Sequence, residues 1–202
     1  MNKIGCLGSS KVISANEVKF LSESFKILLI LSHNNYKISF ANKFIVGKLI
    51  EKIPNIKLNH LEIEYPDLKF DVKTEQNKLQ KAEIIIFQFP LMWFNIPSTI
   101  KKYIEDVFQY GVCPLKGRFV QGKKLIVSLT TGGPEEFYKE DKDKIENLII
   151  GIKRTSEALG MKFLGVVYTC GVGNLSNIED LEKRKGDLEK HVEKIEEMVK
   201  SC

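Results

Sequence analysis

An aromatic cluster is the first of three segments in this chain whose residues are suited to chemistry. The segment Gln88–Pro97 reads QFPLMWFNIP, and its two prolines bracket a group of large apolar side chains that includes the only tryptophan, Trp93. A loop so apolar is costly to leave in water and is well suited to cover the face of a flat ring. A contact between subunits would explain the same residues, so the segment alone leaves both interpretations open.

A second segment is rich in threonine and glycine. Residues Thr130–Pro134 read TTGGP, and Glu135, Glu136 and Tyr138 follow them. Paired glycines let a backbone approach a ligand closely, and exposed N–H groups together with threonine hydroxyls can hydrogen-bond to ring heteroatoms. An ordinary Gly-Gly turn is the alternative.

A third segment, Ser32–Ser39, reads SHNNYKIS and precedes a predicted helix. Its hydroxyls and amides, together with the free N–H groups of a helix start, predict a phosphate site. Simple N-capping by Ser39 is an equally good explanation. The segment contains neither G-x-G-x-x-G nor G-K-[ST], which disfavours nucleotide sites of the dehydrogenase and P-loop types.

The hydrophobic pattern predicts the elements that position these segments. Runs of Ile, Leu, Val and Phe indicate five strands, and their continuous apolar character favours parallel strands that are covered on both faces. The expected strands are Lys26–Leu31, Ile56–Ile63, Glu83–Phe89, Lys124–Thr130 and Lys162–Cys170.

Between the strands, apolar residues recur every three or four positions, as they do on helices with one buried face. The expected helices are Ser39–Ile53, Ser98–Tyr110, Asp143–Leu159 and Asn177–Lys200, while the polar stretch Lys73–Lys81 reads as a short helix or an ordered loop. Five such β–α units with right-handed crossovers form a three-layer α/β sandwich. Ligands of such sheets bind beyond the carboxyl ends of the strands, where all three segments fall.

Composition limits the class of protein. The 202 residues are 43% hydrophobic and 28% charged, which favours one globular domain and excludes a disordered or fibrous chain. The net charge is +5, but the charged residues are interspersed, so we expect no general affinity for nucleic acid.

The chain also lacks the sequence marks of membrane insertion or export. No stretch approaches the roughly 20 apolar residues of a membrane span, and the first 25 residues do not read as a secretory signal. The four cysteines, Cys6, Cys113, Cys170 and Cys202, lie far apart and form no C-x-x-C pair, which predicts free thiols in the cytoplasm and no metal site.

Two long motifs carry a resemblance to a known family. Residues Ile86–Phe108 and Gly122–Tyr138 closely resemble the NAD(P)H:quinone oxidoreductase (DT-diaphorase) family, which includes ancillary quinone reductases of bacterial potassium-efflux systems. The resemblance runs in order over about residues 26 to 171. It implies a flavodoxin-like fold with a five-stranded parallel sheet in the order 2-1-3-4-5, formed by residues 26–202. Residues 1–25 are then an N-terminal extension of unknown role.

The function that the resemblance implies is a flavin-dependent oxidoreductase. The flavin takes a hydride from NADPH or NADH and passes two electrons to a quinone or a similar acceptor, and the protein is a homodimer. A short connection between Gln109 and Gln121, and the lack of a long C-terminal extension, resemble the compact bacterial members and favour FMN over FAD. The alternative function is a flavin-binding regulatory subunit of a potassium-efflux system or another partner. A one-electron carrier is disfavoured, because such carriers usually present an acidic docking face.

The resemblance also assigns site residues by position. Those expected at the flavin phosphate and ribityl chain are His33, Ser39, Phe40 and Asn42. Those expected around the isoalloxazine ring are Pro90, Leu91, Met92, Trp93, Phe94, Thr130, Thr131, Gly132 and Gly133. Glu105 falls where the family carries an acidic residue on the helix after the aromatic segment.

Tyr138 resembles the catalytic tyrosine of the family, which donates a hydrogen bond as charge develops on the reduced flavin. The N–H of Gly132 is expected to act beside it as a preorganised donor. The animal enzymes add a histidine shortly after the tyrosine, whereas Lys139–Ile150 contains none and has Lys144 in that region.

Four basic residues are expected near the Thr130–Pro134 segment, where they would either meet a ligand phosphate or form a solvated surface. They are Lys116, Arg118, Lys123 and Lys124.

Overall fold

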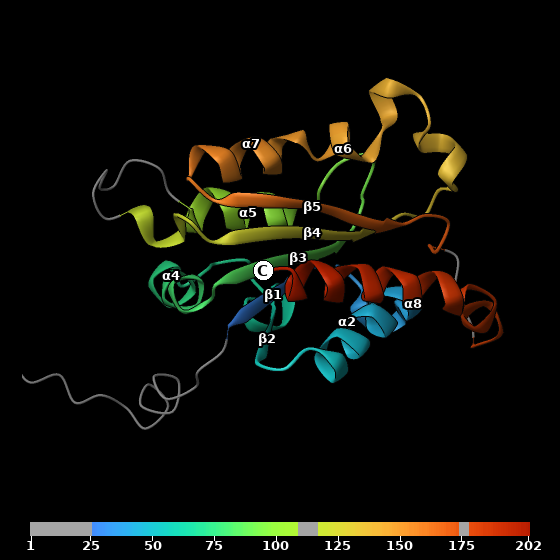
Figure 1. Cartoon of the computed structure of the whole chain (residues 1–202), viewed down its shortest axis with the longest axis horizontal. Coiled ribbons are helices and arrows are strands. Elements are labelled where there is room, and N and C mark those ends of the chain that lie inside the picture. Colours follow the sequence, from blue (N-terminus) through green and yellow to red (C-terminus); the bar gives the residue numbers. More distant parts are fainter. Residues whose placement is uncertain (1–25, 109–116, 174–177) are drawn as a thin grey trace, which may run out of the picture.

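The computed structural model describes residues 26–108, 117–173 and 178–202, which form a three-layer α/β sandwich (Figure 1). Its five parallel strands lie in the order β2-β1-β3-β4-β5, which confirms the predicted fold class and strand order. The strands are β1 (Ile27–Leu31), β2 (Ile56–His60), β3 (Ile84–Pro90), β4 (Lys124–Thr130) and β5 (Lys162–Thr169). The predicted extension, residues 1–25, lies outside the described residues, as do Tyr110, Cys113 and Lys116.

Helices cover both faces of the sheet. On one face lie α2 (Phe40–Lys52) and α8 (Ile178–Lys200), and on the other lie α4 (Val72–Lys81), α5 (Ser98–Val107) and α7 (Ile150–Ala158) (Figure 1). Successive residues of β1 enter opposite cores: Leu29 packs on the α2/α8 side and Ile30 on the other. Both side-chain rows must therefore be apolar, which explains the continuous hydrophobic runs.

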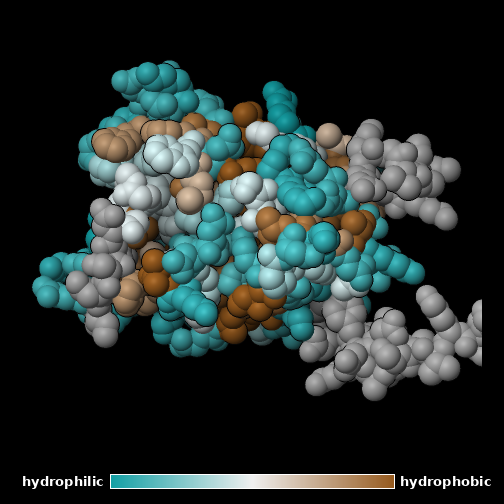
Figure 2. All heavy atoms as spheres, turned by 180° about the vertical axis from the view of Figure 1, so that it is seen from behind, coloured by the Kyte–Doolittle hydropathy of each residue, from teal (hydrophilic) through white to brown (hydrophobic). Residues whose placement is uncertain are grey.

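Short helices complete the described fold and lie in its connections. They are η1 (Tyr36–Ile38), α3 (Leu61–Glu64), η2 (Gly117–Val120), η3 (Glu135–Tyr138), η4 (Asp141–Asp143) and α6 (Ile145–Leu148). In the part of the chain that the structure describes, no helix combines the length and the apolar composition needed to cross a membrane. The back face of the molecule is mostly hydrophilic, with separate hydrophobic patches between the polar side chains (Figure 2).

Two predicted elements are wrong in part. The second strand ends at His60 rather than Ile63, because its partner β1 ends at Leu31, which is paired with His60, and leaves the following residues without a ladder. The predicted helix Asp143–Leu159 is interrupted at Ile149, where φ is −105° and ψ is 11°. Because the buried residues on both sides of this break stay in one core, the helical periodicity conceals it.

The polar stretch Lys73–Lys81 is resolved as a helix, α4. Asp71 caps its start, since the Asp71 carboxylate accepts a hydrogen bond from the Thr74 N–H at 3.1 Å. The helix packs through Leu79 and through two buried charged residues, Glu75 and Lys78, which is why its apolar content is low.

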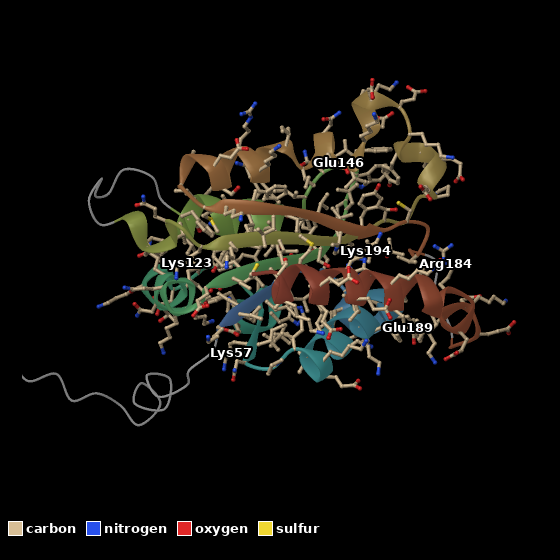
Figure 3. The ribbon with its side chains drawn as sticks, viewed as in Figure 1. Lys57, Lys123, Glu146, Arg184, Glu189 and Lys194 are labelled. Atoms are coloured by element: carbon tan, nitrogen blue, oxygen red, sulfur yellow. The ribbon has the colours of Figure 1, made fainter. Side chains whose placement is uncertain are left out.

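The structure also corrects the expected position of two basic residues. Lys123 and Lys124 lie where β4 begins, whereas the Thr130–Pro134 segment lies where it ends, and seven residues of strand span about 20 Å. The Lys123 ammonium donates to the Gln80 carbonyl at 2.8 Å, and that of Lys124 donates to the Cys202 carbonyl at 2.9 Å. In Figure 3, Lys123 lies at the opposite end of the molecule from Arg184 of α8, whose guanidinium donates to the Cys170 carbonyl just after β5 at 2.7 Å.

Candidate functional site

The carboxyl ends of the central strands bring the three predicted segments together. Backbone hydrogen bonds join the strand ends: Ser32 N–H donates to the Gln88 carbonyl at 3.0 Å, and Leu91 N–H donates to the Thr130 carbonyl at 2.7 Å. A third such bond runs from Thr131 N–H to the Thr169 carbonyl at 3.0 Å. The loops that follow β1, β3, β4 and β5 therefore share one edge of the sheet, which is the ligand-binding edge of a doubly wound fold.

The loop after β1 is held by Glu62, which the sequence analysis did not identify. The Glu62 carboxylate accepts from the Ser32 hydroxyl at 2.6 Å and from the His33 N–H at 3.1 Å. The His33 Nδ1 accepts from the Asn35 N–H at 3.1 Å, so the neutral ring carries its proton on Nε2. Burial is the main cause that lowers the pKa of His33, and Glu62 opposes the shift.

The same loop ends at the start of α2. The Ser39 hydroxyl oxygen caps this helix by accepting from the Asn42 N–H at 3.3 Å, and it accepts again from the Asn42 side-chain amide at 3.0 Å. Phe40 and Ala41 are the first helical residues, and their N–H groups have no carbonyl partner inside the helix. This arrangement of free donors at a helix start is suited to an anion.

The loop after β3 displays its aromatic residues on a tight turn. Met92 and Asn95 exchange backbone hydrogen bonds of 2.8 and 3.0 Å, and the two residues between them, Trp93 and Phe94, have φ angles of 49° and 60°. Asn and Gly are the usual residues in such a turn, so two bulky aromatic residues store strain in it. Trp93 is 92% exposed and Phe94 is half-exposed, whereas Leu91 is buried.

The loop after β4 places Tyr138 beside Gly133. A Cβ atom at Gly133 would lie 2.8 Å from the Phe137 ring and 3.3 Å from the Tyr138 hydroxyl, so a side chain there would require the Phe137 ring to move. Within the described residues, neither Gly132 N–H nor Gly133 N–H donates to a backbone carbonyl. Tyr138 also lies 6.3 Å from Phe94, measured between ring centroids, and a cavity of about 380 Å³ opens along Phe94 and Phe137.

Two positions named in the sequence analysis carry exposed ion pairs. Glu105 lies on the exposed side of α5, where its carboxylate pairs with the Lys101 ammonium at 3.1 Å. Its role as a binding residue stays a prediction. Lys144, which lies in the region where the animal enzymes carry a histidine, forms an exposed ion pair with Asp141.

Behind the loops runs a line of buried polar side chains, most of which the sequence analysis missed. The Gln88 amide donates to the Asn42 side-chain oxygen at 2.8 Å and accepts from the Ser128 hydroxyl. The Ser128 oxygen lies 2.7 Å from His191 Nε2, and Thr169 Oγ1 lies 2.9 Å from His191 Nδ1. We call these five residues, Asn42, Gln88, Ser128, His191 and Thr169, the buried chain; all are at most 7% exposed.

The signals for the buried chain were present in the sequence. Gln88 interrupts the apolar run IIIFQF, and Ser128 interrupts KLIVSL; the two residues are partners in the β3–β4 register. His191 lies on the buried stripe of α8 between Leu188 and Ile195. Burial lowers the pKa of His191 to about 3, so its ring is neutral at pH 7.

The site as a whole fits a ligand with an anionic end and a flat ring. The start of α2 offers donors for an anion, and the aromatic turn and the Gly132–Gly133 backbone offer surfaces and donors for a ring. Among the described residues, no three His, Cys, Asp or Glu side chains come together as metal ligands.

Comparison with known proteins agrees with this geometry. A family model described as "Flavodoxin-like fold" matches residues 25–197. The chain is 32% identical over 172 residues to General stress protein 14 of Bacillus subtilis, covering 83% of this chain and 97% of that protein. It is also 32% identical over 161 residues to the uncharacterized NAD(P)H oxidoreductase YrkL of the same organism, covering 78% and 91%.

A solved structure shows the same fold. It is the general stress protein 14 of Treponema denticola in complex with FMN, which matches with a TM-score of 0.75 and 20% identity over 86% of this chain and 99% of that one.

Proposed function

Because this chain belongs to the flavodoxin-like fold family, we propose that it is an FMN-dependent oxidoreductase of the cytoplasm that takes a hydride from NAD(P)H and passes two electrons to a quinone. A relative that is 32% identical is named an NAD(P)H oxidoreductase, and a protein of the same fold binds FMN. The quinone acceptor rests on the motif resemblance of Ile86–Phe108 and Gly122–Tyr138.

One observation carries the proposal. The donor-rich start of α2 and the strained aromatic turn lie at the carboxyl ends of adjacent strands, joined by the Ser32–Gln88 backbone hydrogen bond. Strain of about 1–3 kcal/mol per residue persists in a fold only when the surroundings impose it, and it concentrates at functional sites. Together these features match the phosphate and the ring of FMN.

The residues of this chain then have distinct roles. Ser39 and the first N–H groups of α2 bind the phosphate, and His33 donates to it through Nε2. The Gly132 and Gly133 N–H groups and the Tyr138 hydroxyl donate where negative charge develops on the bound ring. The flavin itself supplies the hydride and electron chemistry, so the protein needs no nucleophile.

The exposed apolar side chains suggest how the site is covered. Met92 and Phe94 are 39% and 50% exposed, and Trp93 and Phe137 are exposed further. We propose that a second copy of the chain covers this cluster, as the resemblance implies, and leaves room for the nicotinamide and the acceptor to bind in turn.

The test is to purify the chain, release any bound cofactor with acid and identify it by mass. We expect a yellow protein with FMN, and oxidation of NADPH or NADH that is accelerated by menadione. A screen of quinones, nitroaromatics and azo compounds with both nicotinamides then defines the acceptor.

A folded, colourless protein that cannot be reconstituted with FMN or FAD would overturn the proposal. Flavin binding without turnover, together with specific co-purification of a transport protein, would instead support a regulatory subunit.

A further inference from the structure

We propose that the buried chain is a positioning device that fixes the direction of its hydrogen bonds, so that Ser39 and Thr130 must donate their hydroxyl hydrogens to the ligand. The proposal rests on the proposed function, because it concerns the same flavin site. It assigns a role to Asn42, Gln88, Ser128, His191 and Thr169, none of which need touch the reacting atoms.

The direction follows from the orientation of the Gln88 amide, whose oxygen faces Ser128 and whose nitrogen faces Asn42. Ser128 has one hydroxyl hydrogen and donates it to the Gln88 side-chain oxygen, so the Ser128 oxygen must accept from His191 Nε2–H at 2.7 Å. The neutral His191 ring then has a bare Nδ1, which accepts from the Thr169 hydroxyl at 2.9 Å. The tautomer of His191 is therefore set by its partners on two strands.

The same direction continues towards the loops. The Gln88 amide nitrogen donates to the Asn42 oxygen at 2.8 Å, which leaves the Asn42 amide nitrogen facing the site. Its two hydrogens are donated to the Ser39 oxygen at 3.0 Å and to the Thr130 oxygen at 3.1 Å. The polarity of the whole line is thus uniform from Thr169 to Ser39.

This polarity determines how the two hydroxyls at the end of the buried chain, those of Ser39 and Thr130, can bind a ligand. Ser39 accepts from both the backbone and the side chain of Asn42, so both lone pairs of its oxygen are occupied and its hydrogen is free. No described residue accepts from the Thr130 hydroxyl either. With the opposite polarity, Asn42 would present its oxygen, both hydroxyls would donate to it, and the ligand would meet only acceptors. An anionic ligand therefore requires the polarity that the buried chain has in this structure.

The test compares FMN with riboflavin, which lacks the phosphate. Ser128→Ala breaks the line at its centre, and Gln88→Met removes the donor to Asn42 without adding charge. In either variant the Asn42 amide is free to turn its oxygen towards Ser39. We therefore expect the FMN affinity relative to riboflavin to fall about 3- to 10-fold, which corresponds to the free energy of about one hydrogen bond.

Ser156→Ala is the matched control. Ser156 is as buried as Ser128 and its hydroxyl donates to the Lys153 carbonyl at 2.7 Å, but it lies in α7, outside the buried chain. We expect this variant to leave the ratio of FMN to riboflavin affinity unchanged, even where it lowers stability. If Ser128 had only a structural role, Ser128→Ala would leave the ratio of FMN to riboflavin affinity unchanged, as Ser156→Ala should.

An unchanged ratio in folded Ser128→Ala and Gln88→Met would overturn the inference and leave the proposed function intact. If Gln88→Met does not fold, Ser128→Ala alone decides. If the wild-type chain binds neither flavin, both the inference and the proposed function are overturned.

Discussion

The buried chain has a counterpart on the opposite side of the sheet, where Glu75 organises a second set of buried polar groups. The Glu75 carboxylate is fully buried and accepts from Tyr65 at 2.7 Å, Tyr103 at 3.0 Å, Asn59 at 2.6 Å and the Lys78 ammonium at 2.7 Å. Lys78 also donates to Asn59 at 2.9 Å and to Glu64. We call these six residues the Glu75 cluster.

The two sets differ in charge and in closure. The Glu75 cluster is ionic and closed: the Glu75 carboxylate accepts four hydrogen bonds and the Lys78 ammonium donates three, all within the cluster. The buried chain is neutral and open, because it ends in hydroxyl hydrogens at the site. A closed ionic set can only stabilise and specify the fold, whereas an open neutral one can prepare donors for a ligand. Substitutions in the two sets should therefore differ in their effects on stability and on flavin binding.

The largest effect is expected from Glu75→Ala. Removing the carboxylate leaves the Tyr65 and Tyr103 phenols without their acceptor and takes one of three acceptors from the buried Lys78 ammonium, which should lower the free energy of unfolding by about 3–5 kcal/mol. Urea denaturation followed by circular dichroism measures this loss. Glu51→Ala, which removes an exposed partner of Lys48 on α2, should leave the midpoint unchanged.

In the Glu75→Ala protein that remains folded, the preference for FMN over riboflavin should be that of the wild type. A changed preference would show that the cluster reaches the site, and the contrast between the two networks would fail.

The next effect concerns acid and His191. The pKa of His191 is about 3 in the folded protein, against 6.5 ordinarily, because burial disfavours the charged ring. Between pH 3 and 6.5 the unfolded state binds more protons than the folded state. The contribution of His191 to the free energy of unfolding is therefore complete above pH 6.5 and is lost as the pH falls towards 3. From pH 6.5 to 5 it amounts to about 2 kcal/mol.

His191→Gln should remove this part of the pH dependence, as measured by urea unfolding at pH 7, 6 and 5. His33 and His60 also have pKa values lowered by burial, but they remain in both proteins and cancel in the comparison. Parallel curves for wild type and variant would contradict a buried, neutral His191.

A smaller effect distinguishes two helix caps. Ser39 caps α2 at the site, and Asp71 caps α4, which carries Glu75. Replacing either residue by Ala should cost about 1 kcal/mol in stability, because each leaves a helix N–H without its acceptor. Only Ser39→Ala should also weaken FMN binding, as measured by fluorescence titration. Equal FMN affinity in the two variants would remove Ser39 from the phosphate site.

The fold was predictable because its strongest signals are local. Continuous apolar runs gave the five strands, and the break at Ile149 was missed because both halves of that helix bury the same face. The loops of the site were also predictable, since glycines, prolines and aromatic residues are conspicuous after strands.

The two polar networks were not predictable, because they depend on partners distant in sequence. Gln88 is a conspicuous polar residue in an apolar strand, yet its partners lie 46 and 40 residues away. In the sequence Glu75 is an ordinary helix residue, and only the fold brings the Tyr103 and Tyr65 hydroxyls to its carboxylate. Periodicity shows which face of an element is buried, but the pairing of polar groups inside the core requires the three-dimensional register.

The smallest effect on stability is expected from Tyr138→Phe. The Tyr138 hydroxyl has no hydrogen-bond partner among the described residues, so its removal orphans no donor or acceptor and should change stability by less than about 0.5 kcal/mol. In this respect Tyr138 resembles the open end of the buried chain rather than the saturated phenols of the Glu75 cluster. Under the proposed function this hydroxyl donates to the bound flavin, so flavin reduction by NAD(P)H should slow about 10- to 100-fold in the variant with flavin content unchanged. Rapid-mixing absorbance measures this rate. The control Tyr103→Phe removes a hydrogen-bond donor to Glu75 instead, so it should lower stability and leave the rate unaltered.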